Sequence, residues 1–296
     1  MRFVMRGMFV MQLLRYFFPV LSLILVTSFL SIDELEAEET HSLVFSGVVL
    51  EQGNNPLLKQ FSQWLAKQAD YPLTTQFTDS YQGLSDVLRE NSKALAWTCG
   101  APFVEDHAAD QQQLIAIPLF HGAPVYRSFV MTRAGRTEKT LADFKGQVFA
   151  YSDPRSNSGF LAPSYALKQQ GIDIHQHFRY LMHTGLHEYS LEALLAGQAD
   201  VANIDEYVVD EYFKANPDMK DKLVILERLG PFPFTPIVAG KDVPESTVVR
   251  LQQALVSMRE DAQGATMLKQ FGLDGFVVKP VSFYQPIADM LNAVHQ

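Results

Sequence analysis

YSDPRSNSGFLAPSYALKQQG, from Tyr151 to Gly171, is the stretch that decides the fold. The apolar segment VFAYS, which overlaps its start, predicts a short strand leaving a sheet, and LAPSYALKQQG predicts a helix closed by Gly171. Pro163 has no N–H to donate inside a helix, so we place it in or near the first turn. Strand, polar turn and helix in this order indicate an α/β fold.

The turn between strand and helix is rich in hydroxyl and amide groups that can hold an anion. Ser156, Asn157, Ser158 and Gly159 lie at the expected helix start, where N–H groups lack intrahelical partners and the macrodipole supplies about half a positive charge. A phosphate-like oxyanion is favoured there without Lys or Arg, and Gly159 lets the backbone approach it. The alternative is that these side chains only cap the helix. Three small polar residues in a row before a glycine favour the anion site.

The first 40 residues have the layout of a secretory signal peptide. Arg2, Arg6 and Arg15 form a basic region, and an uncharged, mainly apolar run follows from Phe17 to Leu30 before an acidic polar stretch. A transmembrane helix needs about 20 apolar residues, so an uncleaved anchor is the weaker alternative. We therefore expect residues 1–40 to be a signal peptide region and the mature protein to be periplasmic.

Composition excludes several classes of protein. The chain has 24 Lys and Arg against 33 Asp and Glu, a net charge of −9, which disfavours a nucleic-acid partner. Cys99 is the only cysteine, which excludes an internal disulfide, a cysteine-based metal cage and a paired-cysteine redox motif. Because Cys99 lies in an apolar run, we interpret it as an inert core thiol. Its neighbour Gly100 is a candidate for letting the backbone approach a cleft.

Short apolar runs alternate with helical patterns in two series, residues 41–100 and 147–226, which predicts mainly parallel sheets. The extended, turn-rich segments 119–135 and 228–240 are typical of crossings between lobes. We therefore predict two discontinuous α/β lobes with a cleft between them. Lobe one comprises residues 41–130 and 235–296, and lobe two comprises residues 131–234.

Four segments, in this order, carry a resemblance to a known family over nearly the whole mature chain. The mature chain resembles the phosphonate/phosphate/phosphite-binding proteins of ABC transporters, the PhnD-like family of periplasmic solute-binding proteins. The resemblance implies the two-lobed periplasmic-binding-protein fold of the type 2 class, with two crossings and the ligand in the interlobe cleft. The segments are DSYQGLSDVL (79–88), LAWTCGAPFV (95–104), DPRSNSGFLAPSYAL (153–167) and TGLHEYSLEALLAGQADVANID (184–205).

The resemblance also implies which residues bind the ligand. The lobes of the family close on an oxyanion held by the serine-rich helix start and by a histidine about thirty residues later. The matching positions are Ser156, Asn157, Ser158 and His187, and Tyr81 matches an aromatic residue from the other lobe. Asn157 departs from the family's usual threonine. It still offers an N–H donor, with a different geometry.

Family members that hold an aminoalkyl tail place two carboxylates against the amine. One of these falls at Asp205 or Glu206, and the other aligns with Thr235. The missing carboxylate favours a ligand without a cationic tail, such as phosphate, phosphite or methylphosphonate.

Other interpretations of these side chains are weaker. Ser158 with His187 as a hydrolase pair lacks the Gly-x-Ser-x-Gly turn. His183 and His187 have a zinc-like spacing, but Gly185 between them breaks the helix that such a pair needs. Tyr126 is a candidate for the cleft or the core, and the same choice stays open for Tyr207.

We expect a binding protein that performs no chemistry, needs no cofactor or metal, acts as a monomer and delivers its oxyanion to an ABC transporter permease. Two alternatives stay open. One is a binding protein for another anion such as a sulfonate. The other is a sensory ligand-binding module for a membrane receptor, against which the lack of a membrane span after the last helix counts.

Overall fold

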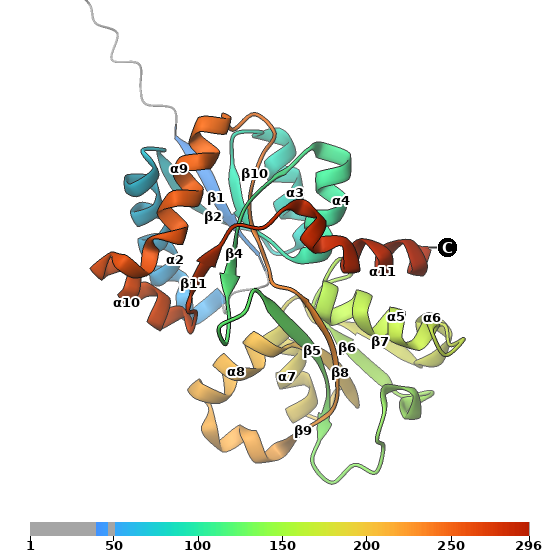
Figure 1. Cartoon of the computed structure of the whole chain (residues 1–296). Coiled ribbons are helices and arrows are strands. Elements are labelled where there is room, and N and C mark those ends of the chain that lie inside the picture. The colour runs from blue at the N-terminus through green and yellow to red at the C-terminus, as the bar shows by residue number, and fades with distance from the viewer. Residues whose placement is uncertain (1–39, 47–50, 296) are drawn as a thin grey trace, which may run out of the picture. The chain divides into compact units, whose positions relative to one another are not determined.

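The computed structural model describes residues 40–46 and 51–295 (Figure 1). The predicted signal peptide, apart from its last residue, lies outside the described residues. Within the described ranges, no helix combines the length and the apolar character that crossing a membrane requires.

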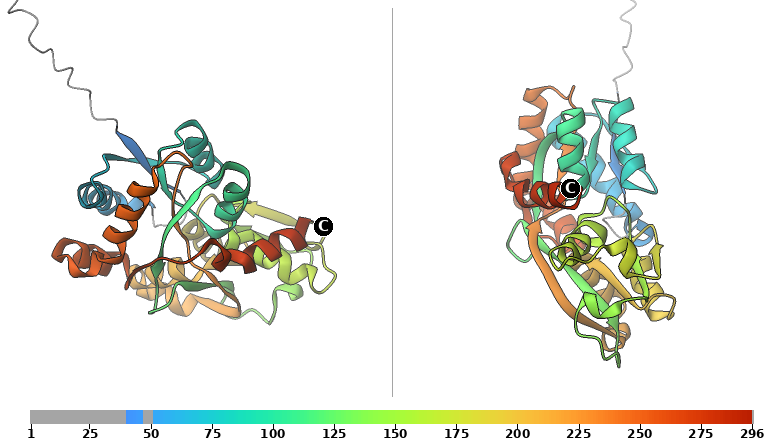
Figure 2. Two further views of the ribbon diagram at one scale, coloured as in Figure 1. Left: turned by 45° about the horizontal axis from the view of Figure 1, so that its top comes forward. Right: turned by 90° about the vertical axis from the view of Figure 1, so that its right-hand side faces the viewer.

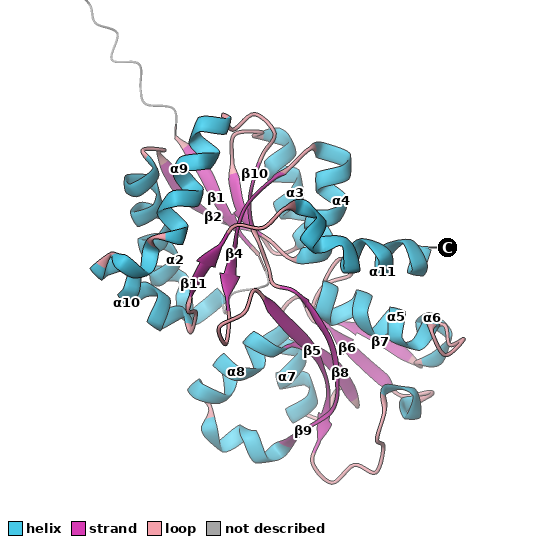
Figure 3. Cartoon of the chain, in the orientation of Figure 1, coloured by secondary structure: helices cyan, strands magenta, loops and turns pink. Residues whose placement is uncertain are grey.

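The described chain forms two β-sheets (Figure 3). The strands of the first sheet are β1 (His41–Phe45), β2 (Leu73–Phe77), β3 (Leu95–Trp97), β4 (Gln113–Leu119), β10 (Ile237–Ala239) and β11 (Gly275–Val277), in the order β11-β4-β10-β3-β1-β2. Those of the second are β5 (Val125–Arg133), β6 (Val148–Tyr151), β7 (Tyr180–His183), β8 (Val201–Asp205) and β9 (Leu223–Pro233), in the order β7-β6-β8-β5-β9.

Helices cover both sheets, as Figure 1 shows. They are α2 (Glu51–Ala69), α3 (Tyr81–Glu90), α4 (Gly100–Asp110), α5 (Ala162–Lys168), α6 (Ile174–His177), α7 (His187–Leu195), α8 (Glu206–Ala215), α9 (Glu245–Val256), α10 (Ala262–Phe271) and α11 (Gln285–His295). Short 3₁₀ turns span Leu141–Phe144, Pro217–Lys222, Met258–Glu260 and Val281–Tyr284, and a π-helical turn, η2, spans Asn157–Leu161. The helix α4 was not among the helices predicted from the sequence.

The two sheets are mixed, so the prediction of mainly parallel sheets is wrong in part. β1 pairs in parallel with β2 and β3, and β6 pairs in parallel with β7 and β8. The strand that follows each crossing runs the other way: β10 is antiparallel to β3 and β4, and β5 is antiparallel to β8 and β9. β11 is also antiparallel to β4. A segment that arrives from the other lobe enters its sheet from the opposite end, which reverses its direction.

The chain passes between the sheets twice, from β4 to β5 and from β9 to β10. All strands of the second sheet therefore lie between residues 125 and 233, and those of the first lie on either side of that range. We call the two parts lobe one and lobe two. Their exact boundaries stay a prediction.

The deciding stretch folds as a strand, a turn and a helix. β6 leads through residues 152–156 into η2, which continues directly into α5. Pro163 lies in the first turn of α5, as predicted. Gly171 follows the helix with a φ of +73°, a conformation that suits glycine.

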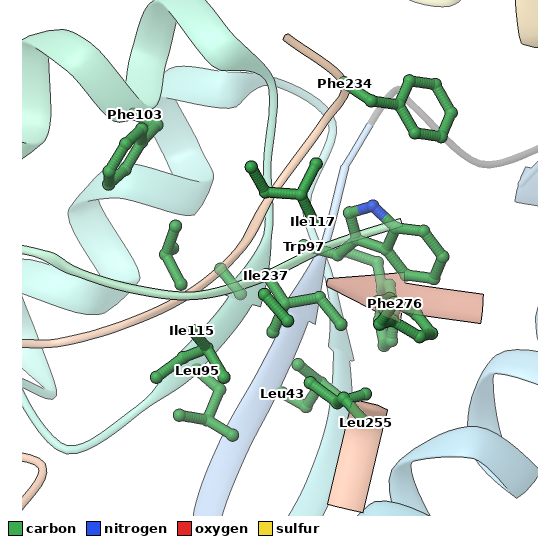
Figure 4. Packing of buried hydrophobic residues seen from close by; sticks show 14 of the residues in the cluster. Leu43, Leu95, Trp97, Phe103, Ile115, Ile117, Phe234, Ile237, Leu255 and Phe276 are labelled. Carbon is green, nitrogen blue, oxygen red and sulfur yellow. The ribbon is translucent and has the colours of Figure 1, made fainter. Parts of the chain in front are cut away.

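The core of lobe one is aromatic. Figure 4 shows Trp97 of β3 next to Phe276 of β11, with aliphatic side chains from β1, β4 and β10 around them. Trp97 also packs edge-on against Phe271, with ring centroids 5.7 Å apart. The same buried cluster takes in Tyr126 and Tyr207 from lobe two, so the lobes share apolar contacts where they meet.

Each face of the second sheet buries its own cluster. Phe129 and Met131 of β5 point to one face, whereas Val130 belongs to the other together with Phe149 of β6. This separation follows from the two-residue period of a strand.

The last helix, α11, contacts both lobes. It packs against α4 of lobe one and against α5 and η2 of lobe two, as the right-hand view in Figure 2 shows. A methyl group added at Gly100 would meet Ile287 of α11 at 2.5 Å. Gly100 therefore permits close packing of α4 on α11.

Phe149 is fully buried and stacks on Phe178 with ring centroids 4.9 Å apart. We expect Phe149→Ala to lower the free energy of unfolding by about 3–5 kcal/mol, because it removes buried surface and leaves a cavity. Val249→Ala, at an exposed position of α9, is the control and should change little. Urea denaturation of both variants tests this, and equal effects would contradict the assigned core.

Candidate functional site

The candidate site lies at the carboxyl edge of the second sheet. Since β6, β7 and β8 run in parallel, the residues that follow them meet at one edge. Ser152 follows β6, and Asp205 ends β8. The Thr184 hydroxyl after β7 bonds to the backbone oxygen of Tyr151 at 3.0 Å, which ties these strand ends together.

Three serine hydroxyls surround one imidazole nitrogen. His187 Nε2 lies 3.2 Å from Ser152 Oγ, 3.3 Å from Ser156 Oγ and 3.3 Å from Ser158 Oγ. All four side chains are buried. Ser156 caps η2 as well, since its hydroxyl accepts the Gly159 N–H at 3.0 Å. The capping and anion-binding interpretations are therefore compatible.

A backbone hydrogen bond decides which nitrogen of His187 carries the proton. The N–H of Asp205 donates to His187 Nδ1 at 3.3 Å, so Nδ1 is the acceptor and the proton of the neutral ring lies on Nε2. Burial lowers the pKa of His187 to about 3. At neutral pH the ring is an uncharged donor that points at the serine cluster.

Gly159 lies against this cluster. A methyl group there would lie 2.6 Å from Ser152 Oγ and 3.2 Å from His187 Cε1. Only glycine leaves room for the hydroxyls and the imidazole, which agrees with the close approach expected from the sequence.

A chain of buried polar side chains holds Ser158 in place. Ser128 Oγ donates to the backbone oxygen of Ser158 at 2.7 Å, and Asn203 Nδ2 donates to Ser128 Oγ at 2.9 Å. Ser128 comes from β5 and Asn203 from β8. The η2 backbone is therefore anchored to the sheet beneath it.

Of the two acidic candidates, Asp205 is the one beside the cluster. It is buried, caps α8 by accepting the Tyr207 N–H at 2.9 Å, and interacts with the Ser158 side chain. Burial raises the pKa of Asp205 to about 8, against the hydrogen bonds from Tyr207, Val208 and Ser158. Glu206 instead accepts the backbone N–H of Arg127 at 2.9 Å.

Lobe one meets the cluster through Tyr81 and Cys99. The Asn157 N–H donates to Cys99 Sγ at 3.3 Å across the lobe boundary. Burial raises the pKa of Cys99 to about 11, which makes it the buried, protonated thiol that we expected. Burial, and after it the neighbouring Cys99 and Asp153, raises the pKa of Tyr81 well above its usual value. Both groups are neutral at pH 7.

Tyr126 belongs to the cluster, whereas Tyr207 does not. Asn157 Nδ2 donates to the Tyr126 hydroxyl at 2.9 Å, so Tyr126 supports the helix start. Tyr207 donates to the backbone oxygen of Phe271 at 2.8 Å and packs in the core between the lobes. Within the described part of the chain, Asn157 Oδ1 has no hydrogen-bond partner although it is buried.

Most of the candidate residues meet at one place: Ser156, Asn157, Ser158, Gly159, His187, Asp205 and Tyr126, with Tyr81 at the boundary of lobe one. Gly100 differs, because α11 fills the space beside it. Ser152 was not predicted as a site residue from the sequence. The sequence did carry a signal for Ser152. This residue directly follows a predicted buried strand, and ligands bind at that edge of α/β sheets.

Thr235 is buried and accepts a hydrogen bond from Trp97 Nε1 at 3.2 Å. His183 is exposed at the end of β7 and stacks on Tyr151. No group of three or more His, Cys, Asp or Glu side chains in residues 40–46 and 51–295 has the arrangement of a metal site.

Comparison with known proteins identifies the class. Residues 44–279 match the family described as the periplasmic substrate-binding protein of phosphonate ABC transporters. The chain belongs to this family, so it is a substrate-binding protein of an ABC transporter and not an enzyme. The family implies a periplasmic location.

One relative is similar in sequence, and two solved structures are similar in fold. The chain is 24% identical over 258 residues to the phosphonates-binding periplasmic protein of Escherichia coli K12, covering 83% of this chain and 76% of the relative. A binding protein of an ABC phosphonate transporter from Pseudomonas aeruginosa superposes with a TM-score of 0.79 at 19% identity, covering 87% of each chain. PhnD1 from Prochlorococcus marinus, in complex with methylphosphonate, superposes with a TM-score of 0.76 at 18% identity, covering 87% of this chain and 99% of that one. The predicted two-lobed fold and the predicted family are confirmed.

The shifted pKa values of His187 and Asp205 predict how the free energy of unfolding depends on pH. His187 has a lowered pKa, so the unfolded chain binds its proton more readily, and the free energy of unfolding rises between about pH 3 and 6.5. Asp205 has a raised pKa, so the folded chain retains its proton, and the free energy of unfolding falls between about pH 4 and 8. Above pH 6.5 only Asp205 of these two groups still changes the free energy of unfolding, which therefore falls as the pH rises to 8.

We expect Asp205→Asn to flatten the loss of stability between pH 6.5 and 8. Asp210→Asn, in the helix that Asp205 caps but outside the cluster, is the control. Urea denaturation at several pH values measures both. Parallel curves for wild type and Asp205→Asn across this window would show that Asp205 is not a buried, proton-retaining group.

Proposed function

We propose that the protein binds a small phosphorus oxyanion in the interlobe cluster and delivers it to an ABC transporter permease in the inner membrane. The observation that carries this proposal is the serine–histidine cluster. The hydroxyl oxygens of three serines lie 3.2–3.3 Å from Nε2 of His187, which carries the ring's N–H. None of these four groups carries a formal charge. Neutral donors in a buried site suit a compact anion with several equivalent oxygens.

The acceptors of the site favour a ligand that still carries a proton. Asn157 Oδ1 is buried without a partner, and a P–OH group can donate to it. Phosphate, phosphite and phosphonates have such a group near neutral pH, whereas sulfate and sulfonates do not. The family description and the methylphosphonate-bound relative support the same class. A sulfonate is the alternative ligand, and a sensor module is the alternative role.

We further propose that residues 1–40 direct export and that the mature protein acts as a monomer. Closure would bring Tyr81 of lobe one onto an oxyanion held by Ser156, Asn157, Ser158, Gly159 and His187 of lobe two, with Tyr126 and Asp205 beside it.

A phosphorus oxyanion should stabilise the mature protein. At a hundredfold excess over Kd, the gain in the free energy of unfolding should be ~2.7 kcal/mol. A thermal-shift screen against phosphate, phosphite, methylphosphonate, aminoethylphosphonate, sulfate and a sulfonate measures it. A response to the sulfonate alone would overturn the ligand class.

His187→Ala and Ser158→Ala should each weaken binding by about one to two decades, because each removes a buried hydrogen bond to the anion. His183→Ala is the matched control, since this imidazole is exposed four residues away on β7. Titration calorimetry with the ligand found in the screen tests the three variants. Wild-type affinity in both site variants would remove these residues from the site.

The protein should prefer phosphate, phosphite or methylphosphonate to aminoethylphosphonate by at least tenfold. A ligand ammonium would be buried against Asp205 alone, because Thr235 offers no carboxylate and its hydroxyl already bonds to Trp97. Thr235→Asp should narrow the difference. Competition titrations that show tighter binding of the aminated ligand by the native protein would contradict this.

A further inference from the structure

Two residues of the turn between β6 and η2, Asp153 and Arg155, contact lobe one. In the sequence they lie between Ser152 and Ser156 of the serine cluster. Asp153 Oδ2 accepts the backbone N–H of Tyr81 at 3.2 Å, and its Oδ1 accepts the N–H of Arg155 at 2.7 Å. Tyr81 is the first residue of α3, where N–H groups lack intrahelical partners. Asp153 therefore caps a helix of lobe one from lobe two, and its charge suits the helix dipole.

Arg155 reaches between α3 and α4. Nη1 donates to Ser85 Oγ of α3 at 2.7 Å, and Nη2 donates to Asp106 Oδ1 of α4 at 2.7 Å. Nε donates to Glu105 Oε2 at 3.0 Å. Each guanidinium nitrogen thus has a partner in lobe one, and none of these partners belongs to the candidate ligand site.

Water screens these contacts less than it screens an ordinary surface ion pair. The side chain of Asp106 is 2% exposed and that of Arg155 is 18% exposed, so water screens the pair weakly. Ser85 Oγ and Gln112 Nε2 also donate to Asp106 Oδ2, which holds the carboxylate in place within lobe one. Lobe one therefore presents a prepared acceptor for Arg155.

We propose that Asp153 and Arg155 form an interlobe clasp that sets how tightly the ligand is held, without touching it. The clasp attaches the segment that supplies Ser152, Ser156 and Ser158 to lobe one. Because separation of the lobes must break these bonds, the clasp stabilises the closed form, and apparent affinity rises with the closed fraction. Arg155 is a positioning residue, and its effect on binding rests on the function proposed above.

A second arginine supplies the matched control. Arg89 Nη2 approaches the same Asp106 oxygen at 3.4 Å, and Arg89 Nε bonds to Asp110 at 2.7 Å, but all these residues lie within lobe one. Arg155→Gln and Arg89→Gln thus remove the same kind of charge from the same carboxylate. Only the first removes a bond between the lobes.

We expect Arg155→Gln to weaken binding of methylphosphonate about tenfold, mainly through faster dissociation, and Arg89→Gln to stay within about twofold of wild type. Calorimetry and stopped-flow dissociation measure this. Wild-type binding by Arg155→Gln would overturn the clasp. Equal losses in both variants would also overturn it, because they would indicate a general role in the stability of α3 and α4.

A measurement without ligand separates the clasp from the proposed function. Spin labels at Ser246→Cys in lobe one and Asp218→Cys in lobe two report the interlobe distance, and the native Cys99 is buried. The unliganded wild type should show a closed population that Arg155→Gln depletes and Arg89→Gln retains. A distribution without that population, or one unchanged by Arg155→Gln, would contradict the clasp.

The two proposals fail in different ways. If the wild type binds neither methylphosphonate, phosphate nor phosphite, the proposed function is wrong, and the distance distributions still test the clasp. If the wild type binds one of them and Arg155→Gln matches it in affinity and distance, the clasp is wrong and the proposed function stands.

Discussion

The hydrogen bond from the Asp205 N–H to His187 Nδ1 is the interaction on which the candidate site depends. It places the proton of a neutral, buried imidazole on Nε2, which faces the hydroxyls of Ser152, Ser156 and Ser158. A charged histidine would cost several kcal/mol at this depth unless an anion were bound. The candidate site therefore holds its donors ready as dipoles, so the attraction proposed for an anion comes from their orientation and not from net charge. The proposal is thus compatible with a chain whose formal net charge is −9.

The two lobes are joined by contacts of different kinds. Tyr207 packs in the buried cluster that the lobes share, which is an apolar contact. Its hydroxyl also donates a hydrogen bond to the backbone oxygen of Phe271. Asn157 bonds to Cys99, and Arg155 bonds to Asp106. These two polar contacts both come from the segment that follows β6. One short segment therefore both shapes the candidate site and contacts the opposite lobe.

Local rules account for the parts that were predicted correctly. Pro163 and Gly171 delimit α5 because proline lacks an N–H and glycine accepts a positive φ. The prediction of mainly parallel sheets did not identify β5 and β10 as antiparallel strands, because direction in a sheet depends on where the chain enters it. Gly100 was assigned to the cleft from its neighbours in sequence. Its real neighbour, Ile287, is almost two hundred residues away and carried no local signal.

Four features follow from residue type and from spacing along the chain: the polar helix start, the glycine that leaves room beside it, the single thiol and, through the order of four segments, the family. Three others became visible only in the folded chain: Ser152 joins the candidate site, Asp205 and not Glu206 lies beside it, and Arg155 contacts lobe one. The reason is that burial, proton position and contacts between lobes arise when distant strands end at the same edge, and no local pattern encodes which ends will meet.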